Sequence, residues 1–286
     1  MAPAYLTQRD HDLLTAVERT PITVHQLRAL SVTFSAAFGS ERRLQDRLMI
    51  LTRAGLLRRF RYAATEGVGR YYYVLTAESY RFLHGSEAHL PSPGLFRDVG
   101  IARQHHTRCL ADFVVRTLVA CHQASVLVGG FARENSLKLT VGEESLYPDC
   151  AFTCCLPDRE FLYYIELDNS TEPLTSPRER DSWQRKLAFY EHLQDLSSTR
   201  FRVLGLITRS SARLRNIVAL AGATAKNPNR SLFYGAVLAD FVRCESPLFT
   251  PLFTDHRGLH VSLLPQPQSV ISPPVQAAEL APATSV

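Results

Sequence analysis

The chain has 286 residues, of which 45% are hydrophobic and 21% charged, and its formal net charge is +5. This length is enough for two ordinary domains with cores of their own, and the composition is that of a soluble globular protein. No apolar run reaches the roughly 18 residues of a membrane-spanning helix, and the first ten residues lack the layout of a secretory signal. We therefore expect a cytoplasmic protein with no membrane partner.

The net positive charge belongs to the N-terminal part of the sequence. Residues 1–85 hold 12 arginines, no lysine and seven acidic residues, whereas the remaining residues hold 20 basic and 20 acidic ones. Eight of the arginines lie between residues 41 and 70. A local excess of this kind indicates a surface that binds phosphate groups, although a solvated helix face is the common alternative.

Three helices followed by a hairpin are predicted for residues 1–90. Thr7 and Thr23 are candidate N-caps of two helices whose apolar residues recur at helical spacing. A third helix begins near Ser40 and ends at Gly55, with leucines at i, i+4 and i+7 on one face. Two β-rich segments around a glycine-containing turn follow, which is typical of a hairpin.

This order of elements predicts an N-terminal winged helix-turn-helix domain. In such a domain the third helix enters the major groove of DNA and the hairpin touches flanking phosphates. Arginine and glutamine have the donors and acceptors that read guanine and adenine edges. Two alternatives stay open, because winged helices also bind proteins and some of these arginines could pair with neighbouring acids. The candidate DNA-binding residues are Arg42, Arg43, Gln45 and Arg47 on the third helix and Arg58, Arg59, Arg61 and Arg70 on the hairpin.

A second domain is predicted after a Pro-, Ser- and Gly-containing linker at residues 84–100. We place the domains at residues 1–90 and 91–264, followed by a disordered tail at 265–286. Helices are expected at 104–123, 181–194 and 211–225, and strands at 146–156, 161–168, 201–208 and 231–242. Helices and strands mixed in this order predict an α/β sandwich around a mixed sheet, so that the whole chain is α/β, or α+β overall. The strand at 201–208 is apolar throughout and is expected at the centre of the sheet.

Two groups of potential metal ligands are interpreted as structural. His105 and His106 are neighbours near a helix start and point about 100° apart, which favours a polar helix terminus over a metal pair. Cys150, Cys154 and Cys155 are close in sequence but form no paired C-x-x-C motif. Strand alternation would separate the last two, so buried thiols are favoured over a zinc site.

Carboxylates gather around residues 147–172, YPDCAFTCCLPDREFLYYIELDNSTE. Glu166 and Asp168 would share one face of a strand. If the segment of Asp149 pairs antiparallel with this strand, the carboxylates converge, and Glu134 can join them from upstream. Such a cluster requires a cation, a proton or water to offset its repulsion. Because Mg²⁺ and Mn²⁺ favour oxygen ligands, the sequence predicts a site for one of them at Glu134, Asp149 and Glu166.

The second domain resembles the restriction-endonuclease-like fold, whose active site has the pattern P-D…(D/E)-x-K. Pro148 and Asp149 match the first part of this pattern, and Glu166 follows Asp149 by 17 residues in a predicted strand. Together with the segments LTQRDHDLL, GLLRRF and KLAFY, this order is similar to the replication-relaxation family of plasmid and mobile-element proteins, over roughly residues 5–245. One position departs from the pattern, because Asp168 stands where it has lysine.

The resemblance implies a protein of plasmid or mobile-element replication, relaxation or mobilisation that binds double-stranded DNA and nicks it with a metal ion. The implied catalytic residues are Asp149, Glu166 and Asp168, with Lys186 of the following helix in place of the missing lysine. A working metal site, an inherited inactive site and a polar hairpin whose acids pair with Arg133 or Arg185 remain as alternatives. The alternative function is a winged-helix transcriptional regulator with a non-catalytic second domain, and a homodimer is left open.

Overall fold

The computed structural model of the chain describes residues 6–63, 71–176 and 182–266. Its elements are α1 (Gln8–Arg19), β1 (Ile22–Thr23), α2 (Val24–Leu30), η1 (Ser31–Thr33), α3 (Glu41–Arg53), β2 (Leu57–Arg61), β3 (Tyr71–Leu75), α4 (Ala77–His84), η3 (Pro93–Phe96), α5 (Ile101–Gln123), β4 (Leu127–Ala132), β5 (Leu139–Val141), β6 (Glu144–Leu146), β7 (Cys150–Cys155), β8 (Glu160–Asp168), α6 (Trp183–Leu196), β9 (Phe201–Ile207), α7 (Ser211–Thr224), β10 (Phe233–Val237), α8 (Leu238–Arg243), β11 (Phe253–Asp255) and β12 (His260–Val261). The mixed α/β class predicted from the sequence is confirmed.

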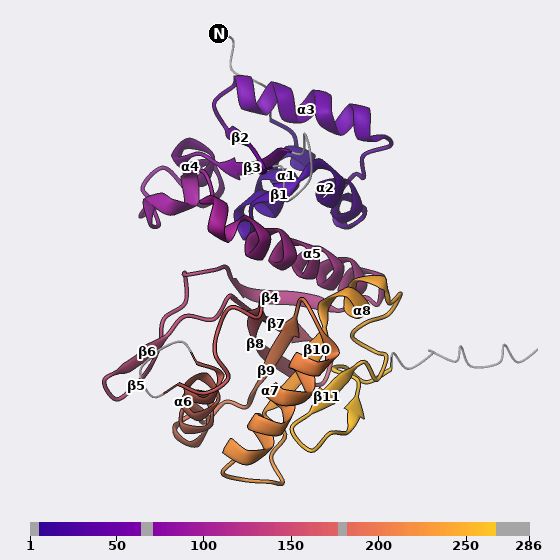
Figure 1. The fold of residues 1–286 in the computed structure, drawn as a ribbon. Coiled ribbons are helices and arrows are strands. Elements are labelled where there is room, and N and C mark those ends of the chain that lie inside the picture. Colours follow the sequence, from indigo (N-terminus) through magenta and orange to yellow (C-terminus); the bar gives the residue numbers. More distant parts are fainter. Residues whose placement is uncertain (1–5, 64–70, 177–181, 267–286) are drawn as a thin grey trace, which may run out of the picture.

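The N-terminal elements are the helices α1 to α3, a small antiparallel sheet with strand order β1-β3-β2, and the helix α4 (Figure 1). Thr7 and Thr23 cap α1 and α2 as predicted, each accepting a hydrogen bond from a backbone N–H in the first turn. The predicted end of α3 is also present, because Gly55 has a φ of 79° and the N–H of Leu56 donates to the carbonyl of Leu51 at 3.0 Å. Glycine adopts this left-handed conformation without steric cost.

The second half is built on a seven-stranded mixed sheet with the order β12-β11-β10-β9-β8-β7-β4. The strands β8, β9 and β10 are parallel neighbours, and the other pairs are antiparallel. The apolar strand predicted at the centre is β9, where Gly205 leaves room for the ring of Phe233 on β10. A Cβ at this glycine would lie 2.6 Å from that ring, so a side chain there would require the buried ring of Phe233 to shift.

Two hydrophobic clusters cover opposite faces of this sheet. One joins α5 and α8 to inward residues such as Phe152 and Ile165, and the other joins α6 and α7 to residues such as Val203 and Phe233. The same strands contribute to both clusters because successive side chains of a strand point to opposite faces of the sheet. The sheet is therefore enclosed between helical layers, as Figure 1 shows.

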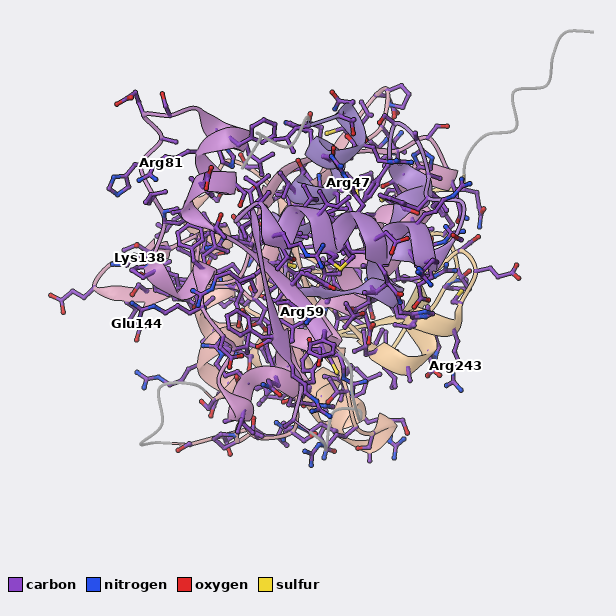
Figure 2. The ribbon with its side chains drawn as sticks, turned by 90° about the horizontal axis from the view of Figure 1, so that it is seen from above. Arg47, Arg59, Arg81, Lys138, Glu144 and Arg243 are labelled. Carbon is purple, nitrogen blue, oxygen red and sulfur yellow. The ribbon has the colours of Figure 1, made fainter. Side chains whose placement is uncertain are left out.

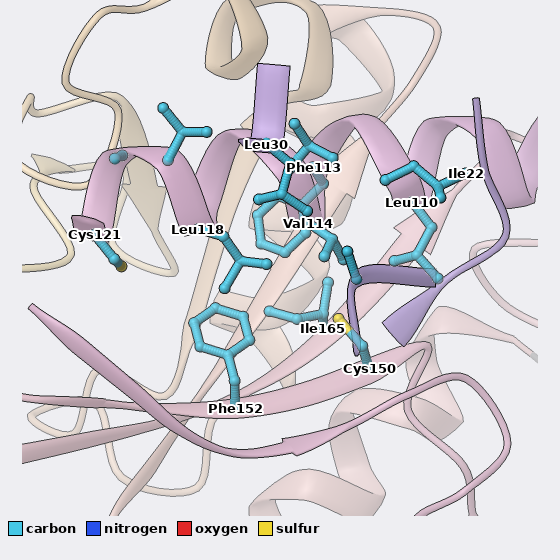
Figure 3. Close-up of a cluster of buried hydrophobic side chains, with 14 of the residues drawn as sticks. Ile22, Leu30, Leu110, Phe113, Val114, Leu118, Cys121, Cys150, Phe152 and Ile165 are labelled. Atoms are coloured by element: carbon cyan, nitrogen blue, oxygen red, sulfur yellow. The ribbon is translucent and has the colours of Figure 1, made fainter. Parts of the chain in front are cut away.

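The helix α5 also contacts the N-terminal half. Leu110 and Phe113 of α5 belong to one buried cluster with Ile22 and Leu30 from the N-terminal elements, and with sheet residues on the other side (Figure 3). The side-chain amide of Gln26 on α2 donates to the carboxylate of Asp112 on α5 at 2.7 Å. The core of the protein thus continues across the predicted boundary at residue 90.

Three local features differ from the sequence predictions or were not among them. The strand expected at 231–242 ends at Val237, and the chain continues as α8 because Leu238 and Phe241, three residues apart, are buried on one helix face. The helix α4 and the strands β1, β4 to β6, β11 and β12 were not predicted. Of the predicted tail, residues 267–286 lie outside the described part of the chain.

All six cysteines are free, and four of them are buried, as expected of thiols in a hydrophobic interior. Among the described residues, no helix is long and apolar enough to cross a membrane.

Candidate functional site

Asp149 lies immediately before β7, where the antiparallel pairing predicted from the sequence brings it beside β8. Its backbone N–H donates to the carbonyl of Ile165 at 2.9 Å, and its side-chain Oδ2 accepts the N–H of Leu167 at 2.7 Å. Both contacts fix the carboxylate at the end of the sheet, close to Glu166. The register of β7 on β8, with Cys150 opposite Ile165, is the reason for this position.

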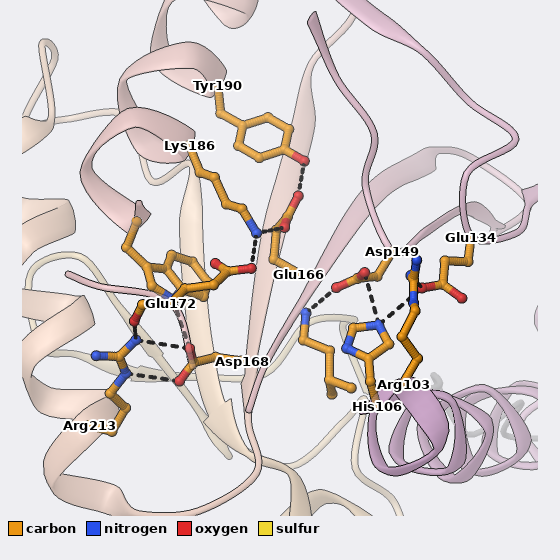
Figure 4. A network of polar contacts seen from close by, with 12 residues as sticks. Arg103, His106, Glu134, Asp149, Glu166, Asp168, Glu172, Lys186, Tyr190 and Arg213 are labelled. Atoms are coloured by element: carbon orange, nitrogen blue, oxygen red, sulfur yellow. Dashed lines mark hydrogen bonds and ion pairs between the residues drawn. The ribbon is translucent and has the colours of Figure 1, made fainter. Parts of the chain in front are cut away.

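His106 of α5 lies between two of the predicted carboxylates (Figure 4). Its Nε2 is 3.0 Å from Oδ1 of Asp149 and 3.4 Å from Oε1 of Glu134. Arg103, one turn earlier on α5, also pairs with Glu134. The three side chains of His106, Glu134 and Asp149 are each 17 to 22% exposed, so the cluster is largely removed from water.

The charges in this cluster are mutually balanced. Burial alone would lower the pKa of His106, but its hydrogen bonds and charge interactions with Asp149 and Glu134 raise that pKa to about 10. Burial would raise the pKa of Asp149, yet the contact with His106 outweighs it and the pKa lies below its ordinary value. At neutral pH an imidazolium therefore bridges two carboxylates.

Glu166 belongs to a neighbouring set of contacts on the α6 side of the sheet. Lys186 donates from Nζ to Glu166 at 2.8 Å and to Glu172 at 2.9 Å, and the hydroxyl of Tyr190 donates to Glu166 at 2.6 Å. Lys186 and Tyr190 are four residues apart, so they occupy one face of α6. Burial, together with the charge of Asp149, raises the pKa of Glu166 to about 7 despite the opposing effect of Lys186.

Asp168 lies on the same face of β8 as Glu166 but has different partners. Its carboxylate accepts from Trp183 at 3.1 Å and from Arg213 of α7 at 2.9 Å and 3.0 Å, and its side chain is fully buried. These contacts saturate the carboxylate and tie α6 and α7 to the end of β8. The structure thus separates Asp168 from Asp149 and Glu134, while it brings Lys186 to Glu166.

The donor set of the His106 cluster fits a divalent cation once the cation displaces the proton of His106, since only a neutral imidazole can be a ligand. Among the described residues, His106, Glu134 and Asp149 form the one group of three such side chains whose ligand atoms all lie within 4.8 Å of one another. Two ligands at about 2.1 Å from one ion and at right angles to each other are about 3 Å apart, close to the separations of His106 from the two acids. Of the predicted metal ligands, Glu134 and Asp149 are in this group, and Glu166 is outside it.

The predicted DNA-binding residues lie on α3 and β2, but they are not equally free. Arg42 and Arg43 are exposed, and Arg42 forms a solvent-accessible pair with Asp46 at 3.3 Å. Arg47 instead turns inward and donates to the buried carboxylate of Asp10 at 2.5 and 2.6 Å. Figure 2 looks down on α3 and the hairpin and labels Arg47 and Arg59.

The remaining residues of this surface make local contacts. Gln45 donates to Glu41 at 2.9 Å, and Arg58 donates to the carbonyl of Phe96 at 3.0 Å. Arg59 stacks on the ring of Tyr71 at 4.4 Å, while Arg61 is exposed. Arg70 lies outside the described residues.

Sequence reasoning missed His106 as a member of the site. Its interpretation as part of a polar helix terminus was incomplete, because its partners Glu134 and Asp149 are brought to α5 only by the folded sheet. Tyr190 and Glu172 were missed for the same reason. For Tyr190 one signal was available, namely its i+4 spacing from Lys186.

The profile of the replication-relaxation family matches residues 15–209, which is more than half of the chain. No curated protein and no solved structure matches it. The matched range extends from α1 to just beyond β9, and it includes all the acidic residues of the candidate site.

Proposed function

The chain belongs to the replication-relaxation family, and from this premise we propose that it binds the DNA of a plasmid or mobile element and nicks one strand. In this proposal the N-terminal half acts as a winged helix on double-stranded DNA, with α3 and the hairpin as its contact surface. The second half acts as a nuclease-like domain whose reactive centre is the end of β7 and β8.

One observation carries the nicking proposal, namely the convergence of His106, Glu134 and Asp149 from three separate elements. These residues would hold Mg²⁺ or Mn²⁺, which supplies Lewis-acid chemistry at a phosphate group when bound. The strand order of the sheet, with β7 antiparallel and β8 parallel to its other neighbour β9, also supports the resemblance to restriction-endonuclease-like proteins.

Lys186 gives the proposed site its second charged group. Its ammonium is held between Glu166 and Glu172 and is only 15% exposed. A cation fixed in this way requires no reorganisation when negative charge develops on a transferring phosphoryl group. Lys186 would therefore replace the lysine that the restriction-endonuclease-like pattern has at the position of Asp168.

A second candidate function is favoured by the balanced charges of the same cluster. His106 and Arg103 supply two positive charges opposite Glu134 and Asp149, so this cluster needs no further ion to offset its charges. Lys186 supplies the cation beside Glu166 and Glu172. In this alternative the second half is a non-catalytic module, and the protein regulates replication or transcription by binding DNA alone.

The experiment is a calorimetric titration of the full chain with Mn²⁺ beside a nicking assay on supercoiled plasmid. Wild type is expected to bind one ion and to produce open-circular DNA, whereas Asp149→Asn and His106→Gln should weaken metal binding at least tenfold and lose nicking. Asp158→Asn is the matched control, because Asp158 is an exposed carboxylate that pairs only with its neighbour Arg159 among the described residues.

Metal binding and nicking by the control, but by neither site variant, support the proposal. If wild type neither binds Mn²⁺ nor nicks, while Asp149→Asn keeps its thermal stability and its affinity for DNA, the non-catalytic alternative takes its place.

A further inference from the structure

A cleft with a volume of about 590 Å³ lies between the N-terminal half and the second half, beside the start of α5. Four arginines line it, Arg19, Arg97, Arg103 and Arg133, together with two acids, Asp98 and Glu134. Glu134 belongs also to the His106 cluster, so the cleft ends at the candidate site.

The four arginines of the cleft outnumber its two acids, and among the described residues neither acid forms an ion pair with Arg19, Arg97 or Arg133. Asp98 accepts from the hydroxyl of Tyr72, and Glu134 pairs with Arg103 and His106. Glu18, which lies near Arg19 and Arg133, is paired with His84 at 2.6 Å. Among the described residues, Arg19, Arg97 and Arg133 have neither an ion pair nor a hydrogen bond from their guanidinium groups.

Two of these arginines are half-buried rather than exposed on the surface. Arg19 of α1 lies over the ring of Phe131 at 5.5 Å, and Arg133 follows β4 next to Glu134. Burial lowers the pKa of Arg19, more than the neighbouring Glu18 raises it. Positive charge that is withdrawn from water without an acidic partner is costly, and an anion that enters the cleft would offset that cost.

We propose that this cleft binds the phosphate backbone of a single DNA strand and leads it to the site at Glu134, His106 and Asp149. The inference rests on the proposed nicking function and adds the path of the strand. A cleft of this volume holds a ligand of ordinary small-molecule size. It is too small to enclose a duplex, whose major groove alone is about 12 Å wide.

The lining of the cleft suits a single strand in a second respect. Single-strand sites combine a basic groove along the backbone with an aromatic ring on which bases stack. Tyr80 of α4 lines the cleft and is half-buried, with its ring packed against His84 at 4.4 Å and Phe96 at 6.1 Å, so it is the aromatic group of the lining that a base would meet. The arginines come from α1, the segment before α5, the first turn of α5 and the segment after β4, so both halves of the protein contribute to the binding surface.

The test is fluorescence anisotropy of the full chain with a short single-stranded oligonucleotide, in EDTA so that no metal contributes. Arg19→Gln and Arg133→Gln are each expected to weaken binding about tenfold, because each removes a charged hydrogen bond to phosphate. Each should also reduce the slope of log affinity against log salt by about 0.7. Arg97→Gln should act in the same direction, and it cannot unfold the protein through lost contacts because Arg97 is exposed.

Arg215→Gln is the matched control, because Arg215 is an exposed arginine on α7, across the sheet from α5. Affinities of Arg133→Gln and Arg97→Gln equal to that of this control would overturn the proposal. Competition by a mononucleotide as effective as that by the strand would also overturn it, since a backbone path requires several phosphates.

The outcome is separable from that of the nicking experiment. If the cleft variants bind the strand normally while Asp149→Asn loses nicking, the path is wrong and the proposed function stands. If the cleft variants lose strand binding but wild type neither binds Mn²⁺ nor nicks, the path stands and the nuclease function is wrong.

Discussion

At the scale of single residues, Arg47 and Asp10 form a buried ion pair that links α3 to α1. The carboxylate of Asp10 also accepts from the backbone N–H and the hydroxyl of Thr7, so it completes the cap of α1. Burial would raise the pKa of Asp10, but the contacts with Arg47 and Thr7 outweigh it and the pKa lies below its ordinary value of 3.8. Arg47 is thus committed to the fold, although it lies within the most basic segment of the sequence.

We expect Arg47→Ala to lower the free energy of unfolding by about 3 kcal/mol, because it leaves the buried carboxylate of Asp10 without its cation. Asp10 binds fewer protons in the folded state than in the unfolded state, so the pair stabilises fully above pH 3.8 and its contribution is lost as the pH falls through the lowered folded pKa. Urea denaturation of wild type and of Arg47→Ala, at neutral pH and below pH 3.8, measures the free energy of unfolding of each.

The difference in the free energy of unfolding between wild type and Arg47→Ala should become smaller below pH 3.8. Arg42→Ala is the control, since its exposed pair with Asp46 is worth at most about 1 kcal/mol. A difference that stays constant over the whole pH range would show that Arg47 stabilises the fold by packing alone.

Lys186 allows a second test at this scale. Lys186→Met keeps the apolar stem but removes the ammonium that contacts Glu166 and Glu172. We expect nicking to fall at least about a hundredfold, as for other groups that stabilise transition-state charge, while Mn²⁺ affinity stays within about threefold of wild type. Equal losses of nicking and of metal affinity would instead indicate that Lys186 only maintains the shape of the site.

At the scale of elements, α3 presents a mixed surface. Arg42 and Arg43 are exposed near its start, and Met49 and Ile50 are 44% and 42% exposed further along. Exposed apolar side chains beside arginines suit the major groove, where thymine methyl groups and base edges are both accessible. We therefore expect that, in the proposed function, duplex DNA contacts the solvent face of α3.

We expect the double variant Arg42→Ala and Arg43→Ala to reduce the salt slope of duplex binding by about 1.8, because each arginine that contacts a phosphate accounts for about 0.9. Fluorescence anisotropy over a salt series measures the slope, with Arg215→Ala as the control. Arg47 is left intact so that stability does not change with charge. A slope equal to that of the control would assign DNA binding to another surface.

Elements with strong local signals could be predicted from the sequence, whereas elements defined by distant partners could not. The caps Thr7 and Thr23, the end of α3 at Gly55 and the apolar strand β9 are all encoded within a few residues. The strand β4 has the sequence LVGGFA, whose two adjacent glycines mask its strand pattern, and it is held by its pairing with β7.

The features of the candidate site also divide into those predictable from nearby sequence and those that depend on distant partners. The antiparallel pairing beside Asp149 follows from the two apolar runs of β7 and β8, and it is correctly anticipated. His106 and Arg213 could not be assigned, since their partners Asp149 and Asp168 lie more than 40 positions away along the chain. Strand alternation alone placed Asp168 beside Glu166, but only the fold shows that Arg213 and Trp183 occupy its carboxylate.

At the scale of the whole molecule, α5 is shared between the two halves. It packs on α2 with one side and on β7 and β8 with the other, within one continuous hydrophobic cluster. The predicted division at residue 90 therefore separates segments of sequence that share a core. Halves that share a core are expected to unfold together.

We expect the full chain to unfold in one calorimetric transition, and Leu30→Ala to lower the free energy of that transition by about 2–5 kcal/mol through the cavity left beside α5. Val32→Ala is the control, because Val32 is 43% exposed. Two separate transitions, of which only one responds to Leu30→Ala, would show that the halves are thermodynamically independent.

The shared helix also limits how this protein can change by recombination. One continuous helix, α5, makes two contacts with distant parts of the chain. The carboxylate of Asp112 accepts a hydrogen bond from Gln26 of α2, and His106, six residues before Asp112, lies beside Asp149. A crossover between relatives in the linker before α5 would join an α2 surface to a helix that evolved against another partner. Hybrids are therefore expected to survive mainly when the exchanged segment ends after Gln123, so that α1 to α5, including the histidine of the candidate site, are inherited as one block.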